Sequence, residues 1–219
     1  EHLNNLGLAN VDRQSHAAWD PGALTIAQHL SAHFDAPLVA SNISRLVYDC
    51  NRPPDAPDAM PKQSERITVP GNANLSPTER QDRVVTYYTP FRALLADTLA
   101  TKPNAVVITL HSFTPVYNGA ARPVQIGVLH DSDTRLADAL LAHPPRGYDV
   151  QRNQPYGPEH GVTHTLKEHA LSAGHLNVML EIRNDLLVTE TQQTEMANTL
   201  ANWLAVALDM RAVDEAHHA

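Results

Sequence analysis

Three apolar runs in this chain each lead into a short group of polar residues, and this pattern constrains the fold most strongly. The runs cover residues 45–48, 105–110 and 176–180, and they are typical of buried β-strands. The polar groups are Tyr48-Asp49-Cys50-Asn51-Arg52, Leu110-His111-Ser112-Phe113 and Leu180-Glu181-Ile182-Arg183-Asn184. Polar side chains at the carboxyl ends of strands in an open α/β sheet converge on one crevice. The sequence therefore predicts a single site built from these three groups.

The rest of the pattern predicts an α/β fold with three layers and a mixed, largely parallel central sheet. Apolar spacing and capping residues indicate helices at residues 23–34, 76–99, 133–142, 163–173 and 190–210. Further strands are expected at residues 38–40, 43–48 and 124–129. Strands that alternate with helices favour a sheet covered by helices. At 219 residues we expect one domain, residues 1–219, with residues 211–219 as a polar tail.

Composition excludes several classes of function. The net charge is −8 and no Lys/Arg block occurs, so we expect no nucleic-acid partner. No apolar run approaches the length that spans a bilayer, so we expect no membrane partner. Cys50 is the single cysteine, which excludes an intrachain disulfide and fits a reducing cytoplasm. A Gly-x-Ser-x-Gly elbow and a Gly-rich phosphate loop are both missing from the sequence.

His111 and Glu181 are the leading candidates for chemistry. A neutral imidazole at the end of a central strand can bind zinc, although a core histidine satisfied by hydrogen bonds is the alternative. Glu181 ends an apolar run, where a carboxylate is costly unless it is paired or used. Burial would raise its pKa, which suits a general base. The alternative is an ion pair with Arg183, because strand alternation puts both residues on one face.

The candidates for substrate binding are Asn51, Arg52, Arg45 and Arg183. An arginine presents a planar fork that binds a carboxylate through two parallel hydrogen bonds. Arg52 enters a Pro-rich loop that could line a site, but it could equally be a surface residue that pairs with a nearby aspartate. Asp20 precedes a predicted helix and is either a helix cap or part of the site.

Taken together and in this order, the three groups resemble the zinc carboxypeptidase superfamily. The closer resemblance is to the N-formylglutamate amidohydrolase family, in stretches spread over nearly the whole chain. These are His16-Ala17-Ala18-Trp19-Asp20-Pro21-Gly22-Ala23, Ser44-Arg45-Leu46-Val47 through Asn51-Arg52-Pro53-Pro54, Val69-Pro70-Gly71-Asn72, His111-Ser112-Phe113-Thr114-Pro115 and Glu181-Ile182-Arg183-Asn184-Asp185-Leu186. The resemblance implies a zinc-carboxypeptidase/phosphorylase-hydrolase-like fold.

The resemblance also implies a zinc-dependent hydrolase that removes the formyl group, or another acyl group, from an N-acyl acidic amino acid. Zinc would activate water, and Glu181 would take its proton. Asn51 and Arg52, with Arg45, would hold the substrate carboxylate. A carboxypeptidase-like or aspartoacylase-like deacylase is the alternative enzyme, and a metal-free module that binds acidic amino acids is the alternative without catalysis.

One departure from the family concerns the metal. Members of the family begin with a strand that ends in an acidic-His-Ala-Ser type motif and supplies an early zinc ligand. The present sequence starts after that position, so we expect this N-terminal strand to be missing. His111 is then the expected metal ligand, Asp20 is the best candidate for an acidic ligand, and one ligand position has no residue assigned to it.

Overall fold

The computed structural model describes residues 2–218, with side chains from residue 3 to residue 210. The α-helices are α1 (Asn10–Arg13), α2 (Ala23–His33), α3 (Pro77–Arg83), α4 (Thr89–Ala100), α5 (Arg135–Ala142), α6 (His164–His169) and α7 (Glu190–His218). The strands are β1 (Gln63–Ser64), β2 (Ile67–Thr68), β3 (Val106–Phe113), β4 (Val116–Tyr117), β5 (Ala120–Ala121), β6 (Ile126–Leu129), β7 (Val150–Arg152) and β8 (Leu176–Arg183). Short 3-10 turns are η1 (His2–Gly7), η2 (Pro57–Ala59), η3 (Pro70–Asn72), η5 (Pro158–His160), η6 (Leu171–Ala173) and η7 (Asn184–Leu186), and η4 (Val84–Tyr88) is a π-helical turn.

The central sheet has the strand order β3-β8-β6-β7. β3 runs parallel to β8 and β6 runs parallel to β7, whereas β6 and β8 are antiparallel. The predicted α/β fold with a mixed, mostly parallel sheet is therefore confirmed. Two small antiparallel hairpins, β1-β2 and β4-β5, lie outside this sheet.

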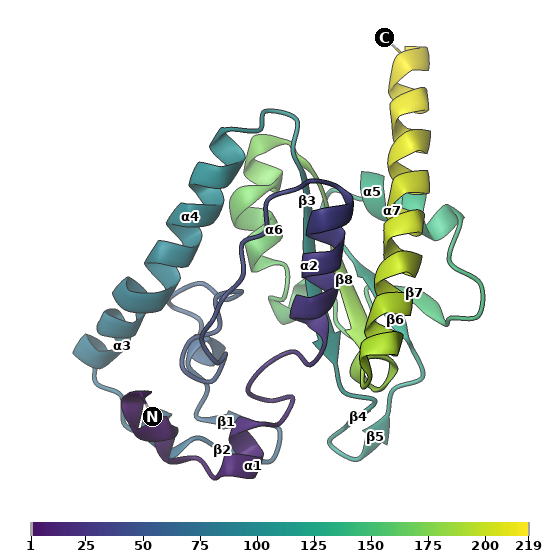
Figure 1. Ribbon diagram of the computed structural model, residues 1–219. Helices are drawn as coiled ribbons and strands as arrows, with labels where there is room; N and C mark the ends of the chain where they lie inside the picture. Colours follow the sequence, from purple (N-terminus) through teal and green to yellow (C-terminus); the bar gives the residue numbers. More distant parts are fainter. Residues whose placement is uncertain (1, 219) are drawn as a thin grey trace.

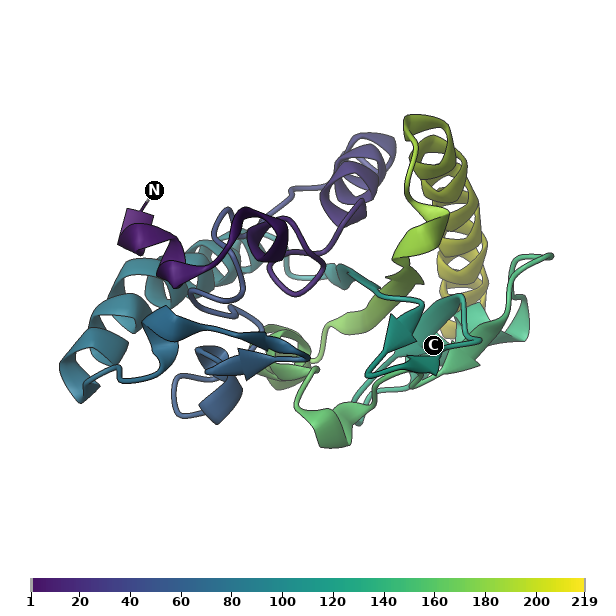
Figure 2. The same ribbon diagram turned by 90° about the horizontal axis from the view of Figure 1, so that it is seen from below.

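Helices cover both faces of the sheet, as expected when each strand buries residues on both sides. On one face, Val178, Leu180 and Ile182 of β8 join a core with residues from α2, α5 and α7. On the other face, Met179 of β8 and Val107 of β3 pack with residues from α6. Figure 1 shows α2 in front of the sheet with α7 beside it, and Figure 2 shows the same layers from below.

The predicted helices agree with the structure except at their ends. The helix expected at 76–99 is a continuous helical run through α3, η4 and α4. Ser76 caps it, because its Oγ accepts from the Glu79 N–H at 3.2 Å while the Glu79 carboxylate accepts from the Ser76 N–H at 2.9 Å. α6 is shorter than expected, and η6 completes the predicted segment.

The strands predicted at 38–40 and 43–48 are wrong. Residues 44–48 form a turn, in which the Val47 N–H donates to the Ser44 carbonyl at 2.8 Å and the Leu46 N–H donates to Ser44 Oγ at 3.2 Å. A serine side chain that bonds to the nearby backbone competes with strand pairing. The apolar residues of this run are still buried, in clusters away from the sheet.

The closing helix α7 is longer than the predicted 190–210 and continues to His218. The predicted polar tail, residues 211–219, therefore begins inside this helix, and its side chains lie outside the described residues. The first part of α7 packs on the sheet, and Trp203 Nε1 donates to the Leu140 carbonyl of α5 at 2.9 Å. Among the described residues, no helix has the length and apolar character needed to cross a membrane.

Candidate active site

His111 and Glu181 lie side by side on adjacent strands. The parallel pairing of β3 with β8 places them in register as direct Cα partners. Residues directly opposite in a sheet point to the same face, and here that face is the one covered by α6, because Val107 and Met179 share it. The prediction that two of the three polar groups meet at the carboxyl ends of neighbouring strands is confirmed for this pair.

A chain of charged groups extends from His111. Its Nδ1 lies 2.8 Å from Oδ2 of Asp20, which lies three residues before the start of α2. Arg45 donates from Nη1 to Asp20 Oδ1 at 3.0 Å and from Nη2 to Asp49 Oδ2 at 3.1 Å. Ser112 Oγ donates to the Pro21 carbonyl at 2.8 Å and so fixes the end of β3 against the start of α2. Asp20 and Arg45 are thus joined to His111 in one hydrogen-bonded cluster, and their roles in metal and substrate binding stay predictions.

The pKa values in this cluster follow from burial and neighbouring charges. Burial raises the pKa of Glu181 from its ordinary value of 4.5 to about 7, against the lowering effect of the positive groups around it. For Asp20, burial opposes ionisation, but the charge of Arg45 and the hydrogen bond from His111 outweigh it and lower the pKa. For His111, burial acts to lower the pKa, while Asp20 and Glu181 together raise it. Glu181 is therefore poised to exchange a proton near neutral pH.

Glu181 has an unused acceptor. Its side chain is buried, with 5% of the residue exposed, and its Oε2 has no hydrogen-bond partner among the described residues. Glu181 and Arg183 do not form the ion pair that was the alternative interpretation, because the ion pairs of the described residues do not include it. Arg183 instead pairs with Asp185 at 2.8 Å and donates to the carbonyl oxygens of Arg122 and Pro123 at 2.9 and 3.0 Å. Arg183 thus anchors a loop, and its role in substrate binding stays a prediction.

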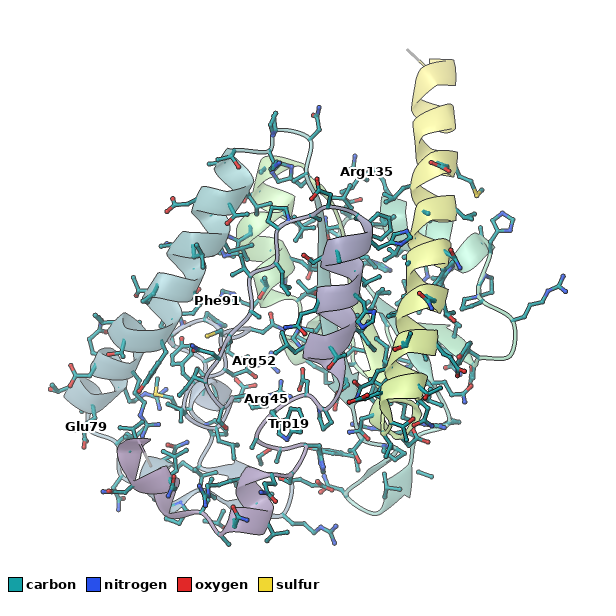
Figure 3. All side chains as sticks on the ribbon, viewed as in Figure 1. Trp19, Arg45, Arg52, Glu79, Phe91 and Arg135 are labelled. Carbon is teal, nitrogen blue, oxygen red and sulfur yellow. The ribbon has the colours of Figure 1, made fainter. Side chains whose placement is uncertain are left out.

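Asn51 and Arg52 are held by the protein itself. Asn51 is buried, its Nδ2 donates to the Val162 carbonyl at 2.5 Å, and its Oδ1 accepts from the N–H and Oγ1 of Thr165 at 3.0 and 2.7 Å. Arg52 pairs with Asp58 through Nε at 2.6 Å. Figure 3 labels Arg45 and Arg52 in the middle of the molecule. Within the described residues neither Asn51 nor Arg52 hydrogen-bonds to Glu181, His111 or Asp20, so a clamp made of the two stays a prediction.

The bonds of Asn51 predict a structural effect. Asn51→Ala would leave the Val162 carbonyl and the Thr165 N–H and hydroxyl without their partner in a buried setting. We expect the free energy of unfolding to fall by about 2–3 kcal/mol, measured by urea denaturation. Arg66→Ala, at a residue for which the structure records no ion pair, is the control. A variant with unchanged stability and a raised KM would contradict this structural role.

Two further residues near Glu181 were not predicted from sequence. Arg122 follows β5, and its positive charge acts on the pKa of Glu181. Arg122 Nη1 donates to the hydroxyl of Tyr156 at 2.9 Å, and the pKa of Tyr156 is raised by burial and by Glu181, against the effect of Arg122. The aromatic residues that surround Arg122 are the signal that could have identified it, but they lie too far apart in the sequence to form a motif.

Gly127 allows the chain segment with Tyr156 to come close to the sheet. It is the β6 partner of Glu181. A Cβ at Gly127 would overlap the carbonyl oxygen of Gln154, two residues before Tyr156. The absence of a side chain at Gly127 therefore lets residues 154–156 approach the sheet beside the Glu181 carboxylate.

The donor set does not by itself fit a zinc ion. A catalytic zinc site takes three protein ligands. His111 and Asp20 bring two donor atoms together, but Asp20 is also bound to Arg45. Among residues 3–210, whose side chains the structure describes, no group of three or more His, Cys, Asp or Glu side chains is arranged to hold a metal ion. We therefore derive no step through zinc.

Comparison with known proteins agrees with the resemblance seen in the sequence. The family model for N-formylglutamate amidohydrolase matches residues 1–188. The crystal structure of gene product Atu2144 from Agrobacterium tumefaciens is 51% identical with a TM-score of 0.93, over 95% of this chain and 84% of that one. N-formylglutamate amidohydrolase from Ralstonia eutropha JMP134 is 16% identical, with a TM-score of 0.51 over 86% of this chain and 81% of its own, which shows a shared fold. No curated protein matches the chain. The chain belongs to the N-formylglutamate amidohydrolase family.

Proposed function

We propose that this protein hydrolyses the amide bond of an N-acyl acidic amino acid such as N-formylglutamate, with Glu181 as the general base. The observation that carries the proposal is the state of Glu181. Its carboxylate is buried, one oxygen has no partner, and its pKa lies near 7. A carboxylate in this state is costly to keep and is common where proton transfer is needed. Family membership supports an amidohydrolase with a small-molecule substrate.

The proton transfers follow from the chemistry of amide hydrolysis. Glu181 accepts a proton from water as the water oxygen attacks the acyl carbon. The C–N bond then breaks, and Glu181 returns that proton to the leaving amine. Formate and the free amino acid are the products when the acyl group is formyl. A pKa near 7 suits both halves of this cycle, because the group can take and release the proton at neutral pH.

The groups around Glu181 would stabilise the negative charge that develops on the carbonyl oxygen. Asp20 holds His111 through Nδ1, which fixes the ring. Arg45 is held on both sides, by Asp20 and Asp49, so its charge stays in place during the reaction. Positive groups that are already oriented lower the barrier without a cost of reorganisation. Asp20 and Asp49 thus orient His111 and Arg45 toward the developing charge, and Arg45 also contributes to substrate binding.

Formate release from N-formyl-L-glutamate tests the function. We expect wild-type protein to release formate in equal amount to glutamate, with activity rising as the pH increases through about 7, since Glu181 must be unprotonated. N-acetyl-L-aspartate and a peptide with a C-terminal glutamate serve as comparison substrates. Faster turnover of either would favour the deacylase or carboxypeptidase alternative. Binding without turnover of any of them would favour the non-catalytic module.

Zinc dependence, expected from the resemblance, stays a prediction. Elemental analysis of the purified protein, paired with formate release before and after chelation, measures it directly. About one zinc per chain, with activity that is lost on chelation and restored by zinc, would confirm the prediction. Full activity in metal-free protein would contradict it.

The single cysteine, Cys50, is buried and unpaired, and on this basis we propose that the protein is located in a reducing compartment such as the cytoplasm.

A further inference from the structure

Arg122 differs from six other arginines of the described residues in its partners. Six arginines form ion pairs with carboxylates, and these are Arg45, Arg52, Arg92, Arg135, Arg152 and Arg183. Arg122 has no carboxylate partner within the described residues. The Nη1 bond to Tyr156 is also its only side-chain hydrogen bond there. A guanidinium has five N–H donors, so most of the donors of Arg122 have no hydrogen-bond partner among the described residues.

Aromatic rings hold the guanidinium of Arg122 in place. Its Cζ lies 4.5 Å from the ring centre of Tyr117, 4.8 Å from that of Tyr156 and 5.7 Å from that of Phe113. These distances are within the range of cation–π attraction. Rings that contact the flat faces of a guanidinium fix its plane and leave the N–H groups along its edge available. The side chain is thus held by aromatic rings, and no carboxylate among the described residues forms an ion pair with it.

The position of Arg122 relative to Glu181 is set by β3. Phe113 lies two residues beyond His111 on the same strand, and therefore on the same face of the sheet. Two strand residues span about 7 Å. The backbone of Phe113 is therefore displaced along the strand from the His111–Glu181 pair by roughly this distance, and the Arg122 guanidinium lies against its ring, with Cζ 5.7 Å from the ring centre. Its charge still reaches Glu181, whose pKa it lowers.

This displacement suits one part of the proposed substrate. In N-formylglutamate, five bonds join the formyl carbon to the side-chain carboxyl carbon, a span of about 6 Å when the bonds are extended. If the formyl carbon is beside Glu181, the side-chain carboxylate can reach Arg122. The α-carboxylate is only three bonds from the formyl carbon, so it would lie closer to Arg45.

We propose that Arg122, held between the rings of Phe113, Tyr117 and Tyr156, is the residue that binds the side-chain carboxylate of the substrate and selects acidic amino acids. The assignment rests on the proposed function for the identity of the substrate. The chemistry of the subsite does not depend on the proposed function, because it is that of a guanidinium held by rings and without a carboxylate partner among the described residues. A carboxylate at this position would complete a charge-assisted pair.

The test measures selectivity for the side-chain carboxylate. For wild-type protein, kcat/KM for N-formyl-L-glutamate should exceed that for N-formyl-L-glutamine, which has an amide in place of that carboxylate. Arg122→Gln should raise KM for the acid about 10- to 100-fold and leave the glutamine analogue nearly unchanged. Arg122→Lys should restore part of the selectivity, because it keeps the charge but loses the fork. Arg92→Gln, which removes an exposed arginine paired with Glu168, is the control and should change neither.

A second measurement separates this assignment from the proposed function. Glutarate cannot be hydrolysed, so its binding, measured by calorimetry, reports on the subsite without turnover. Binding to wild type that is weakened by Arg122→Gln supports the subsite even if formate release fails. Formate release with selectivity unaffected by Arg122→Gln overturns the subsite and leaves the function standing. An equal loss for both substrates, with a lower melting temperature, would show that Arg122 only supports the structure and would also overturn the assignment.

Discussion

Replacing Glu181 with glutamine is expected to lower kcat for N-formyl-L-glutamate by about 10²- to 10⁴-fold, with a smaller effect on KM. Glutamine matches the shape of glutamate but cannot accept a proton from water, so only the contribution of general base catalysis is removed. The measurement is steady-state formate release. Arg92→Gln serves again as the control for handling and folding. A kcat within a few-fold of wild type would rule out Glu181 as the base.

The same substitution is expected to stabilise the protein at high pH. Because the pKa of Glu181 is raised from 4.5 to about 7 in the folded state, the folded protein holds a proton that the unfolded chain has lost between these values. The stability that this proton provides is complete below pH 4.5 and is lost as the pH rises through 7. Glu181→Gln avoids the loss, so its free energy of unfolding should exceed that of wild type by about 3 kcal/mol at pH 8 and by little at pH 5.

Urea denaturation at the two pH values measures this difference. If the difference in free energy of unfolding between variant and wild type is the same at both pH values, ionisation of Glu181 does not destabilise the folded state. Loss of activity with gain of stability is the pattern expected of a group kept for function. The two results together separate a catalytic role for Glu181 from a purely structural one.

Gly127→Ala is expected to have a large effect on both stability and activity. The added methyl group would overlap the backbone carbonyl of Gln154, which cannot move without shifting its segment. We expect the free energy of unfolding to fall by about 2–3 kcal/mol. The displaced segment carries Tyr156, the hydrogen-bond partner of Arg122, so KM for N-formyl-L-glutamate should also rise.

Gly157→Ala is the matched control for this prediction. The three atoms nearest to its added methyl group belong to the carboxylate end of Glu159, an exposed side chain that can swing away. Denaturation and kinetics on both variants should show a large change for Gly127→Ala and a small one for Gly157→Ala. Similar effects for both would mean that the approach of Gln154 to Gly127 does not control the position of Tyr156.

The parts of the fold that could be predicted from sequence are those set by local pattern. β3, β6 and β8 each follow an apolar run, a pattern that favours a strand; β6 and β8 are buried as expected, whereas β3 lies at the edge of the sheet and is mostly half-buried. The pairing of His111 with Glu181 followed because both residues end such runs. The run at residues 43–48 is also apolar, but its burial in a turn depends on Ser44 and on contacts with distant segments, which periodicity does not encode.

Residues of the site could likewise be predicted only where they stand in a local sequence pattern. Asp20 and Arg45 were found because they stand in recognisable stretches, and the structure joins them to His111. Asn51 and Arg52 are bonded to Thr165 and Asp58, and only the tertiary structure shows these partners. Arg122 was missed because three aromatic residues from different segments surround it. Residues that gain their role from such distant neighbours have no local pattern.

The pairing of His111 with Glu181 also has a consequence for folding. Side chains alternate along β8, so a slip of one residue in its register would turn Glu181 toward the core formed with α2, α5 and α7. A carboxylate there would lie in a core formed mainly of apolar side chains, and its desolvation would destabilise the slipped sheet. The residue that we assign to proton transfer therefore also discriminates against misaligned sheets during folding. Selection for catalysis and selection for the correct strand alignment act on the same side chain.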